Sequence, residues 1–244
     1  MKLTVIGHWG GFPKVGEASS GYLLEHEGFR LLVDCGSAVL SQLQYYLKPT
    51  ELDAVIISHY HPDHVADIGV LQHALIIAKY TEGFSRNLPI YGHEEDQAGF
   101  AALTYKNLTT GMVYKGDQLL HIGPFQIEFI ETVHPVPCYA MRIKAGSKTL
   151  IYTADTAYFP ELAEFAKGAD LILCECNYYK DMKEAAFNHM TSDQAGQLAR
   201  LANAKKLVLT HLPHFGNYEQ LISEAKEDYP GDIILASSGL AITI

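Results

Sequence analysis

The fold is decided by a stretch of seven residues, Ser58-His59-Tyr60-His61-Pro62-Asp63-His64. It follows the apolar run Ala54–Ile57, which has the composition of a buried strand. In extended backbone, side chains two residues apart point to the same side of the chain. The imidazole rings of His59 and His61 are therefore expected to face one point just beyond the end of this strand.

A helix is expected to begin directly after this pair. Pro62 disfavours helical backbone at the preceding residue and is well tolerated in a first helical turn. Asp63 and His64 then lie in that first turn and are expected to point back to the same place. Zinc binds His nitrogen and Asp oxygen at about 2.0–2.2 Å, so four such side chains within six residues predict a site that can hold two ions.

The remaining chain alternates between strand-like and helix-like segments. Short apolar segments predict strands at Leu3–Gly7, Gly21–Glu25, Phe29–Asp34, Ala54–Ser58, Pro89–Tyr91, Phe125–Thr132, Tyr139–Lys144, Lys148–Thr153, Leu171–Cys176, Lys206–Thr210 and Asp232–Ala236. Apolar residues at three- and four-residue spacing predict helices at Ala38–Leu47, Val65–Lys79, Glu94–Tyr105, Phe159–Lys167, Ser192–Ala202 (with Ser192 as its N-cap) and Tyr218–Asp228. Hairpin turns are expected at Glu27-Gly28 and Gly146-Ser147. This pattern favours mixed sheets covered by helices, in an α/β or α+β fold.

Composition narrows the classes of protein and of partner. The 244 residues are 48% apolar and 19% charged, a globular balance, and 28 acidic against 18 basic residues give a net charge of −10. That charge argues against a protein that binds long nucleic acid, although it does not exclude a small anionic substrate. No segment has the length of a membrane span or of a signal peptide, so we expect a soluble cytoplasmic protein with reduced cysteines and no membrane partner.

The seven-residue stretch carries the His-x-His-x-Asp-His motif, and here the chain resembles the metallo-β-lactamase superfamily along nearly its whole length. The other positions of the family pattern are filled in order by Gly10-Gly11-Phe12-Pro13, Asp34, His134, Asp155 and His211. The resemblance implies an α/β fold of the αββα sandwich type, with two mixed sheets packed face to face and helices on both outer faces. It also implies a single domain over residues 1–244.

The resemblance further implies how the ligands are shared between two metal ions. The first ion is expected at His59, His61 and His134, the second at Asp63, His64 and His211, with a bridge from Asp155 and a water or hydroxide. Asp34 is expected to orient the ligand loop. The implied ions are two Zn²⁺, although the same ligands accept Mn²⁺ or Fe²⁺. Two zinc ions, two aspartates and one hydroxide carry a net charge of +1, which would attract an anionic substrate.

A second motif indicates the branch of the superfamily. His189, in Phe187-Asn188-His189-Met190-Thr191-Ser192, resembles the histidine of ribonuclease Z and related phosphodiesterases that contacts the scissile phosphate, and Glu175 resembles its carboxylate partner. A departing alkoxide needs a proton donor, and a carboxylate would keep that donor protonated and oriented. The bland alternatives are a capping or surface histidine and a surface carboxylate at a strand end.

The chain departs from ribonuclease Z at one place. Only 21 positions separate His134 from Asp155, enough for one hairpin and not for the long tRNA-binding arm. The sequence therefore predicts a two-metal phosphodiesterase in which a metal-bridging hydroxide attacks a small phosphodiester, such as a cyclic nucleotide or a short oligonucleotide. The predicted catalytic residues are Asp63, His189 and Glu175. The alternatives are a lactone or thioester hydrolase and a non-catalytic metal-binding protein; a homodimer is a further expectation from the resemblance.

Overall fold

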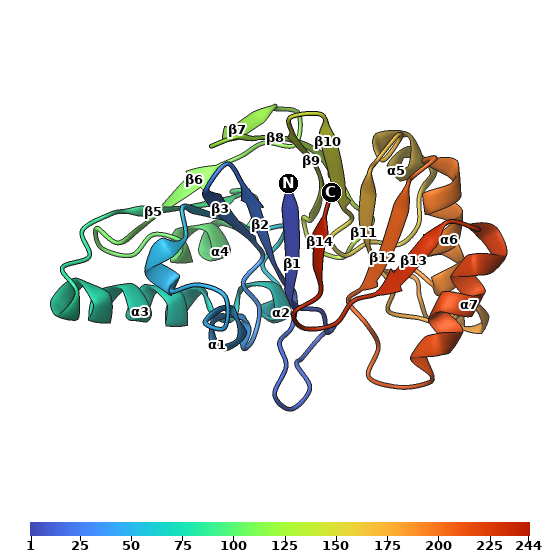
Figure 1. Cartoon of the computed structure of the whole chain (residues 1–244), viewed down its shortest axis with the longest axis horizontal. Helices are drawn as coiled ribbons and strands as arrows, with labels where there is room; N and C mark the ends of the chain where they lie inside the picture. Colours follow the sequence, from blue (N-terminus) through green and yellow to red (C-terminus); the bar gives the residue numbers. More distant parts are fainter. The chain divides into compact units, whose positions relative to one another are not determined.

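Two seven-stranded sheets, one in each of two compact units, make up the framework of the chain (Figure 1). The computed structural model describes residues 1–244. The first unit contains residues Met1–Lys115 and Ser237–Thr243, and the second contains Gly116–Ala236 together with Ile244. Both sheets are mixed, as the sequence predicts.

The sheet of the first unit has the order β14-β1-β2-β3-β4-β5-β6. Its strands are β1 (Lys2–Gly7), β2 (Gly21–His26), β3 (Phe29–Val33), β4 (Ala54–Ile56), β5 (Leu88–Gly92), β6 (Thr109–Val113) and β14 (Ala241–Thr243). Pairing is antiparallel from β14 to β3 and parallel from β3 to β6. Glu27 and Gly28 both have positive φ, 49° and 81°, which is the backbone of a tight hairpin turn and confirms the turn predicted there.

Helices cover one side of this sheet (Figure 1). They are α1 (Val39–Leu43), the 3₁₀ helix η1 (Pro49–Glu51), α2 (Pro62–Val65), α3 (Ile68–Thr81) and α4 (Gln97–Ala102). The apolar face of α3 carries Leu71 and Leu75, which are fully buried in one cluster with Val55 and Ile90 of the strands. Burying each such side chain contributes about 1.5–3 kcal/mol, so this cluster fixes α2 and α3 against the end of β4.

The sheet of the second unit has the order β13-β12-β11-β10-β9-β8-β7. Its strands are β7 (Leu120–Ile122), β8 (Phe125–Glu131), β9 (Tyr139–Ala145), β10 (Lys148–Tyr152), β11 (Leu171–Glu175), β12 (Lys206–Thr210) and β13 (Asp232–Leu235). Pairing is antiparallel from β7 to β10 and parallel from β10 to β13. The turn between β9 and β10 lies at Gly146, with φ of 59°, where it was predicted.

The helices of the second unit are α5 (Pro160–Phe165), the 3₁₀ helix η2 (Lys180–Met182), α6 (Ser192–Leu201) and α7 (Tyr218–Asp228). Ala195, Leu198 and Ala199 form the buried stripe of α6, as the spacing predicts. The N-cap of α6 is Thr191 and not Ser192, so that prediction was wrong by one residue. Thr191 and Gln194 form a capping box, in which each side chain binds the other residue's backbone N–H.

The structure corrects several predicted element boundaries. The single helix expected over residues 65–79 is two helices, α2 and α3, with Ala66 and Asp67 between them. The helix expected from Glu94 begins at Gln97, because the Asp96 side chain accepts a hydrogen bond from Gly99 N as its N-cap. Strands β6, β7 and β14 were not predicted: each has only three to five residues, and Gly111 interrupts the apolar pattern of β6.

In both sheets the candidate functional residues follow the carboxyl ends of strands. Asp34 follows β3 and the motif follows β4, whereas Asp155, Glu175 and His211 lie at the ends of β10, β11 and β12. All five of these strands belong to the parallel part of their sheet. Carboxyl ends of parallel strands meet at one edge, which is where ligands bind in open α/β sheets.

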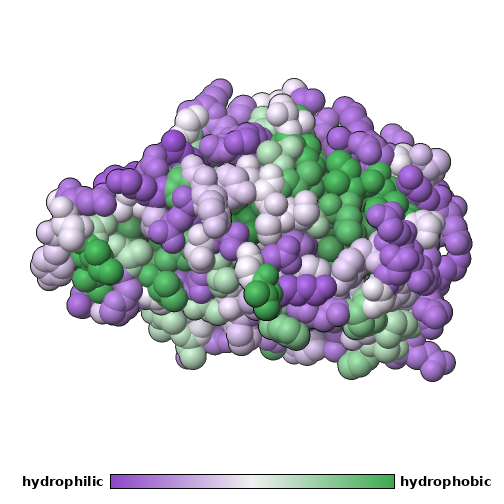
Figure 2. Space-filling model, turned by 60° about the horizontal axis from the view of Figure 1, so that its bottom comes forward, coloured by the Kyte–Doolittle hydropathy of each residue, from purple (hydrophilic) through white to green (hydrophobic).

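The surface is largely hydrophilic on the face that Figure 2 shows, with hydrophobic residues gathered in a few patches. Helix α3 exposes three large side chains, Val70, Ile77 and Tyr80. No helix combines the length and the apolar composition that crossing a membrane requires. All four cysteines are buried and none forms a disulfide, as predicted.

Candidate functional site

The first unit brings four of the predicted metal ligands together at the end of β4. His59 Nε2 lies 3.1 Å from His61 Nδ1. Helix α2 begins with Pro62 directly after His61, and in its first turn Asp63 Oδ2 lies 3.6 Å from His64 Nε2. The residue pattern therefore places both pairs as predicted.

Asp34 holds this loop in place. One carboxylate oxygen accepts from Ser58 N at 2.8 Å, and the other accepts from Ser58 Oγ at 2.8 Å and from His64 Nδ1 at 2.7 Å. All three residues are fully buried. Because Ser58 Oγ donates to Asp34, it accepts from His59 Nδ1 at 3.1 Å. The Nδ1 atoms of His59 and His64 thus face acceptors, which makes both Nε2 atoms the candidate ligand atoms, and Asp34 holds this loop through three hydrogen bonds.

Two glycines allow the chain to approach Asp63 closely. Gly11 N donates to Asp63 Oδ2 at 2.7 Å, so the glycine-rich loop after β1 contacts a candidate ligand directly. Gly36 lies so near the Asp63 backbone that a Cβ at this position would overlap the carbonyl oxygen of Asp63. The loop after β1 is itself fixed, since Trp9 Nε1 donates to Glu17 and Lys14 Nζ lies 4.0 Å from the centroid of the Trp9 ring.

The second unit brings Asp155 and His211 together. Asp155 Oδ2 lies 3.2 Å from His211 Nε2, and both side chains are buried. Thr132 Oγ1 donates to the Asp155 carbonyl at 2.9 Å. Ala154 and His211 each have a φ of 51°, in the left-handed region that residues other than glycine rarely adopt. Such strained positions persist only where the surrounding structure holds them, and they cluster at functional sites.

Three histidine rings of the second unit lie beside one another. The centroid of His189 is 5.3 Å from that of His211, with the planes 17° apart, and 5.4 Å from that of His134. His134 Nδ1 lies 3.4 Å from the carbonyl oxygen of Asn188, an acceptor, so Nε2 is its candidate ligand atom. His189 is therefore neither a helix cap nor an isolated surface residue.

Glu175 is the centre of a buried hydrogen-bond network and not a surface carboxylate. Its side chain is 1% exposed. Oε1 accepts from Thr156 N at 2.7 Å and from His189 Nδ1 at 2.8 Å, and Oε2 accepts from Met190 N at 3.1 Å. The carboxylate thus joins the loop that carries Asp155 to the loop that carries His189, and it holds the His189 ring through Nδ1.

Asn177 is a site residue that the sequence analysis missed. It lies two positions beyond Glu175, and its side-chain Nδ2 contacts both the Nδ1 atom and the carbonyl oxygen of His211, each at 3.1 Å. The only signal in the sequence is its spacing from Glu175 at a strand end. Ser58, Thr132 and Thr156 were likewise given no role, because their hydrogen bonds depend on partners from other strands.

The spacing of the ligand atoms fits a divalent ion such as zinc. With bonds of about 2.0–2.1 Å, the ligands of a tetrahedral ion lie about 3.3 Å apart. The three pairs measured within the units, His59–His61, Asp63–His64 and Asp155–His211, are separated by 3.1, 3.6 and 3.2 Å. Neutral imidazole and carboxylate groups are also the donors that zinc, iron and manganese accept. The first unit thus presents two closely spaced pairs of candidate ligands, and the second unit presents one.

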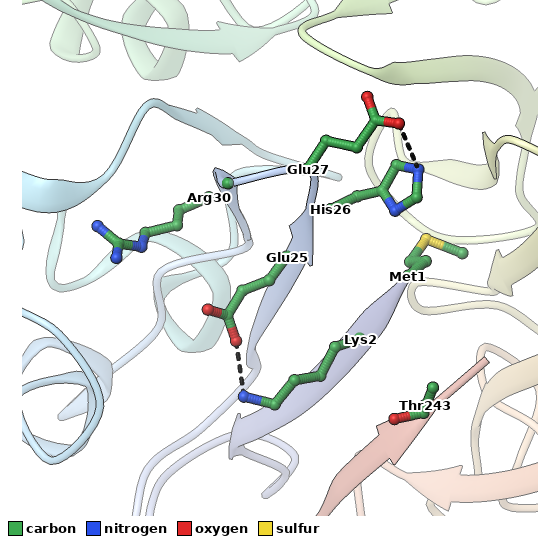
Figure 3. Close-up of a pocket in the computed structure, with 8 residues that line it drawn as sticks. Met1, Lys2, Glu25, His26, Glu27, Arg30 and Thr243 are labelled. Atoms are coloured by element: carbon green, nitrogen blue, oxygen red, sulfur yellow. Dashed lines mark hydrogen bonds and ion pairs between the residues drawn. The ribbon is translucent and has the colours of Figure 1, made fainter.

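A hollow at the turn between β2 and β3 is not a comparable site (Figure 3). It has a volume of about 300 Å³ and contains none of the predicted ligands. Lys2 Nζ pairs with Glu25 at 2.8 Å, and Glu27 lies 3.9 Å from the ring of His26. Arg30, which also lines this hollow, pairs with Glu51 at 3.0 Å, so these side chains already have partners of opposite charge.

Comparisons with known proteins identify the family of the chain. The sequence model of the Beta-lactamase superfamily domain matches residues 29–212, which contain all seven predicted ligands as well as Glu175 and His189. The probable metallo-hydrolase YhfI of Bacillus subtilis is 51% identical over 239 residues, 98% of each chain. The crystal structure of YhfI, a metallo-beta-lactamase fold protein, superposes with a TM-score of 0.97 at 50% identity, covering 99% of this chain and 98% of that one.

Two more distant matches extend over nearly the whole chain. Ribonuclease Z of Haloarcula marismortui is 24% identical over 305 residues, covering 98% of this chain and 96% of its own. The crystal structure of a diphosphatase from the PhnP family shares the fold, with a TM-score of 0.78 at 19% identity and coverage of 100% and 97%. On the match over residues 29–212 and the likeness to YhfI, the chain belongs to the beta-lactamase superfamily and has the metallo-β-lactamase fold.

Proposed function

We propose that the protein is a metal-dependent hydrolase that cleaves a small phosphodiester, such as a cyclic nucleotide or a short oligonucleotide. The name of YhfI, probable metallo-hydrolase, supports hydrolysis. The names ribonuclease Z and diphosphatase of two further matches support phosphorus chemistry. The observation that carries the proposal is the Glu175–His189 pair, because a buried carboxylate behind an accessible imidazole provides a proton donor for a leaving oxygen.

The proposed metal ligands are the seven predicted residues. His59, His61 and His134 would hold one ion, Asp63, His64 and His211 would hold the other, and Asp155 would bridge them. The preformed pairs within each unit support this assignment. When bound, two divalent ions supply Lewis acidity and lower the pKa of a bound water towards about 7. Zinc is the proposed metal because the donor set is rich in imidazole.

The protein's own residues provide the proton. His189 Nδ1 donates to Glu175 at 2.8 Å, so the carboxylate orients the ring and favours its protonated form. The His189 side chain is 22% exposed, so its Nε2 can reach a substrate oxygen. Proton transfer from a positioned side chain contributes about 10²–10⁴ in rate. His189 is accordingly the proposed general acid for the departing oxygen, and Glu175 is its positioning residue.

The test is hydrolysis of bis(p-nitrophenyl) phosphate by protein loaded with Zn²⁺ or Mn²⁺. The wild type is expected to cleave this substrate, whose p-nitrophenolate needs no proton to leave. On a 2′,3′-cyclic nucleotide, whose departing alkoxide needs one, His189→Ala is expected to lose about 10²–10⁴ in kcat while it keeps its metal content. His121→Ala is the matched control, because His121 lies exposed on β7 and outside the site. A wild type that cleaves the cyclic nucleotide, with a His189→Ala variant that keeps the full rate on it, would refute the role of His189.

A panel of substrates separates the proposal from its alternatives. Lactones and glutathione thioesters test whether a carbonyl carbon is the better electrophile. If these esters are cleaved faster than any phosphodiester, and His189→Ala is without effect, the protein is a carboxylic ester hydrolase. Full metal loading without hydrolysis of any ester would instead indicate a metal-binding protein without turnover.

A further inference from the structure

A pocket of about 360 Å³ opens between the start of α3 and helix α4 in the first unit. Its walls are mainly glycine and aliphatic side chains, to which Tyr60, Gln72 and Asp96 add polar groups. A volume above about 300 Å³ and an apolar lining with a few polar groups are typical of sites that bind small molecules. The pocket therefore has the size and the composition to hold a ligand.

The pocket lies apart from the candidate metal centre. None of the seven predicted ligands lines it. Side chains alternate in extended backbone, so Tyr60 points away from the side that His59 and His61 share. Its ring packs on α4 at Gly99, where a Cβ would overlap the ring. Tyr60 thus lies between the loop of metal ligands and α4.

Gln72 provides a hydrogen-bond acceptor in the wall of the pocket. The residue is only 6% exposed, and its Nε2 donates to the carbonyl oxygen of Ala102 at 2.9 Å and to Thr109 Oγ1 at 3.2 Å. With the amide reversed, two oxygen atoms that only accept would face each other at Ala102. The orientation of the amide is therefore fixed, and no hydrogen bond within the chain reaches Oε1. This nearly buried oxygen is left for a group that enters the pocket.

The other polar side chains of the pocket also offer acceptors. Asp96 Oδ1 accepts from Gly99 N at 2.9 Å as the N-cap of α4, which leaves Oδ2. The Tyr60 hydroxyl donates its proton to the carbonyl oxygen of His93 at 2.6 Å, so its oxygen can only accept a further bond. No lysine or arginine lines the pocket. Acceptors and one carboxylate beside apolar walls are complementary to a positively charged donor with an apolar body.

We propose that this pocket binds a small primary amine with an aromatic or aliphatic body. The ammonium group donates to Gln72 Oε1 and to the carboxylate of Asp96, and the apolar body packs against Val65, Ile68 and Leu103. The site is separate from the proposed metal centre, and the inference does not depend on hydrolysis of a phosphodiester.

The probe is benzylamine, which joins an ammonium group to an apolar ring at neutral pH. In a titration followed by ¹H–¹⁵N NMR, benzylamine is expected to shift the side-chain amide of Gln72 and the backbone amides of Gly69 and Gly99. Benzyl alcohol, the neutral analogue, is expected to bind about two- to fivefold more weakly, which is the contribution of a partly exposed charge pair.

Variants test the walls and the charge of the pocket separately. Gly69→Leu fills the pocket from α3, because a Cβ at Gly69 meets nothing within 4 Å, and it is expected to weaken benzylamine binding at least about tenfold. Asp96→Asn keeps the N-cap of α4, because asparagine caps as well as aspartate, and should make the two probes bind equally. Glu94→Gln is the matched control, since Glu94 is exposed and outside the pocket, and it should leave both affinities unchanged.

The outcomes distinguish this site from the proposed function. Benzylamine that binds Gly69→Leu as tightly as the wild type, or benzyl alcohol that binds the wild type as tightly as benzylamine, overturns the proposal. If Gly69→Leu does not fold, Ala98→Leu fills the pocket from α4 and must weaken binding in the same way. A wild type that binds benzylamine here but cleaves no phosphodiester refutes the proposed function and leaves the amine site standing. An active hydrolase without benzylamine binding refutes the amine site alone.

Discussion

Replacing Glu175 by glutamine tests the buried network in a way that can be worked out from its hydrogen bonds. The carboxylate receives protons from Thr156 N, His189 Nδ1 and Met190 N. Glutamine has the same shape but turns one of the two oxygens into an amide donor. Whichever way the amide faces, the backbone N–H of Thr156 or that of Met190 then meets a second donor. A buried group left without an acceptor costs about 1–3 kcal/mol.

The expected result is a Glu175→Gln variant whose free energy of unfolding is lower by about 1–3 kcal/mol, measured by urea denaturation followed by circular dichroism. Hydrolysis of the phosphodiester should fall as well, by up to the 10²–10⁴-fold that a general acid contributes, because His189 loses the charge that favours its protonated form. Glu184→Gln, in the exposed part of the segment that leads to His189, is the matched control and should change stability by less than about 0.5 kcal/mol. A Glu175→Gln variant as stable as this control would refute the network.

Three further predictions concern the rest of the chain. Gly69→Ala should stabilise the protein by about 0.5 kcal/mol, because the new Cβ would meet open space on α3. Gly99→Ala should instead destabilise it by about 1–3 kcal/mol, because the new Cβ would overlap the Tyr60 ring. Thermal denaturation of the two variants tests both predictions. Burial raises the pKa of Glu224, but hydrogen bonds from Ser192 Oγ, Lys180 N and Gln220 outweigh this effect and lower the pKa overall. The stability that these bonds contribute is complete above the usual pKa of 4.5 and is lost as the pH falls below it. The difference in unfolding free energy between wild type and Glu224→Gln should therefore shrink between pH 5 and pH 3, and a constant difference would contradict this. Burial raises the pKa of the thiols of Cys35, Cys174 and Cys176 well above the usual 9.0. At pH 8 the native protein should therefore resist Ellman's reagent, and the urea-unfolded protein should react fully. Rapid labelling of these thiols in the native protein would contradict their buried positions.

Local chemistry made part of this structure predictable. The motif from His59 to His64 combines side-chain alternation with a proline-initiated helix, and both are properties of a few adjacent residues. Glu27-Gly28 and Gly146-Ser147 were recognisable as turns for the same reason. The four candidate ligands that the motif itself supplies lie together in the first unit.

What the sequence could not provide are features that depend on distant partners. Strands β6, β7 and β14 are recognisable only beside the strands with which they pair. The division between α2 and α3 depends on Asp67, whose carboxylate accepts from Leu40 N of α1 and whose backbone N donates to Cys35 O. Asn177 gains its role only because β11 and β12 are parallel neighbours that end side by side. The extent of the chain as one domain over residues 1–244 stays a prediction.

The close approach of Gly36 to Asp63 has a consequence for reading a saturation-mutagenesis map of this protein. Any side chain at position 36 would displace the carbonyl of the residue that also supplies a carboxylate to the proposed centre. Such a map would therefore score Gly36 as severely as the histidines, although glycine has no side chain with which to bind an ion or move a proton. Intolerance there measures how little space separates two loops, and a designer who wishes to alter the chemistry should leave that position untouched.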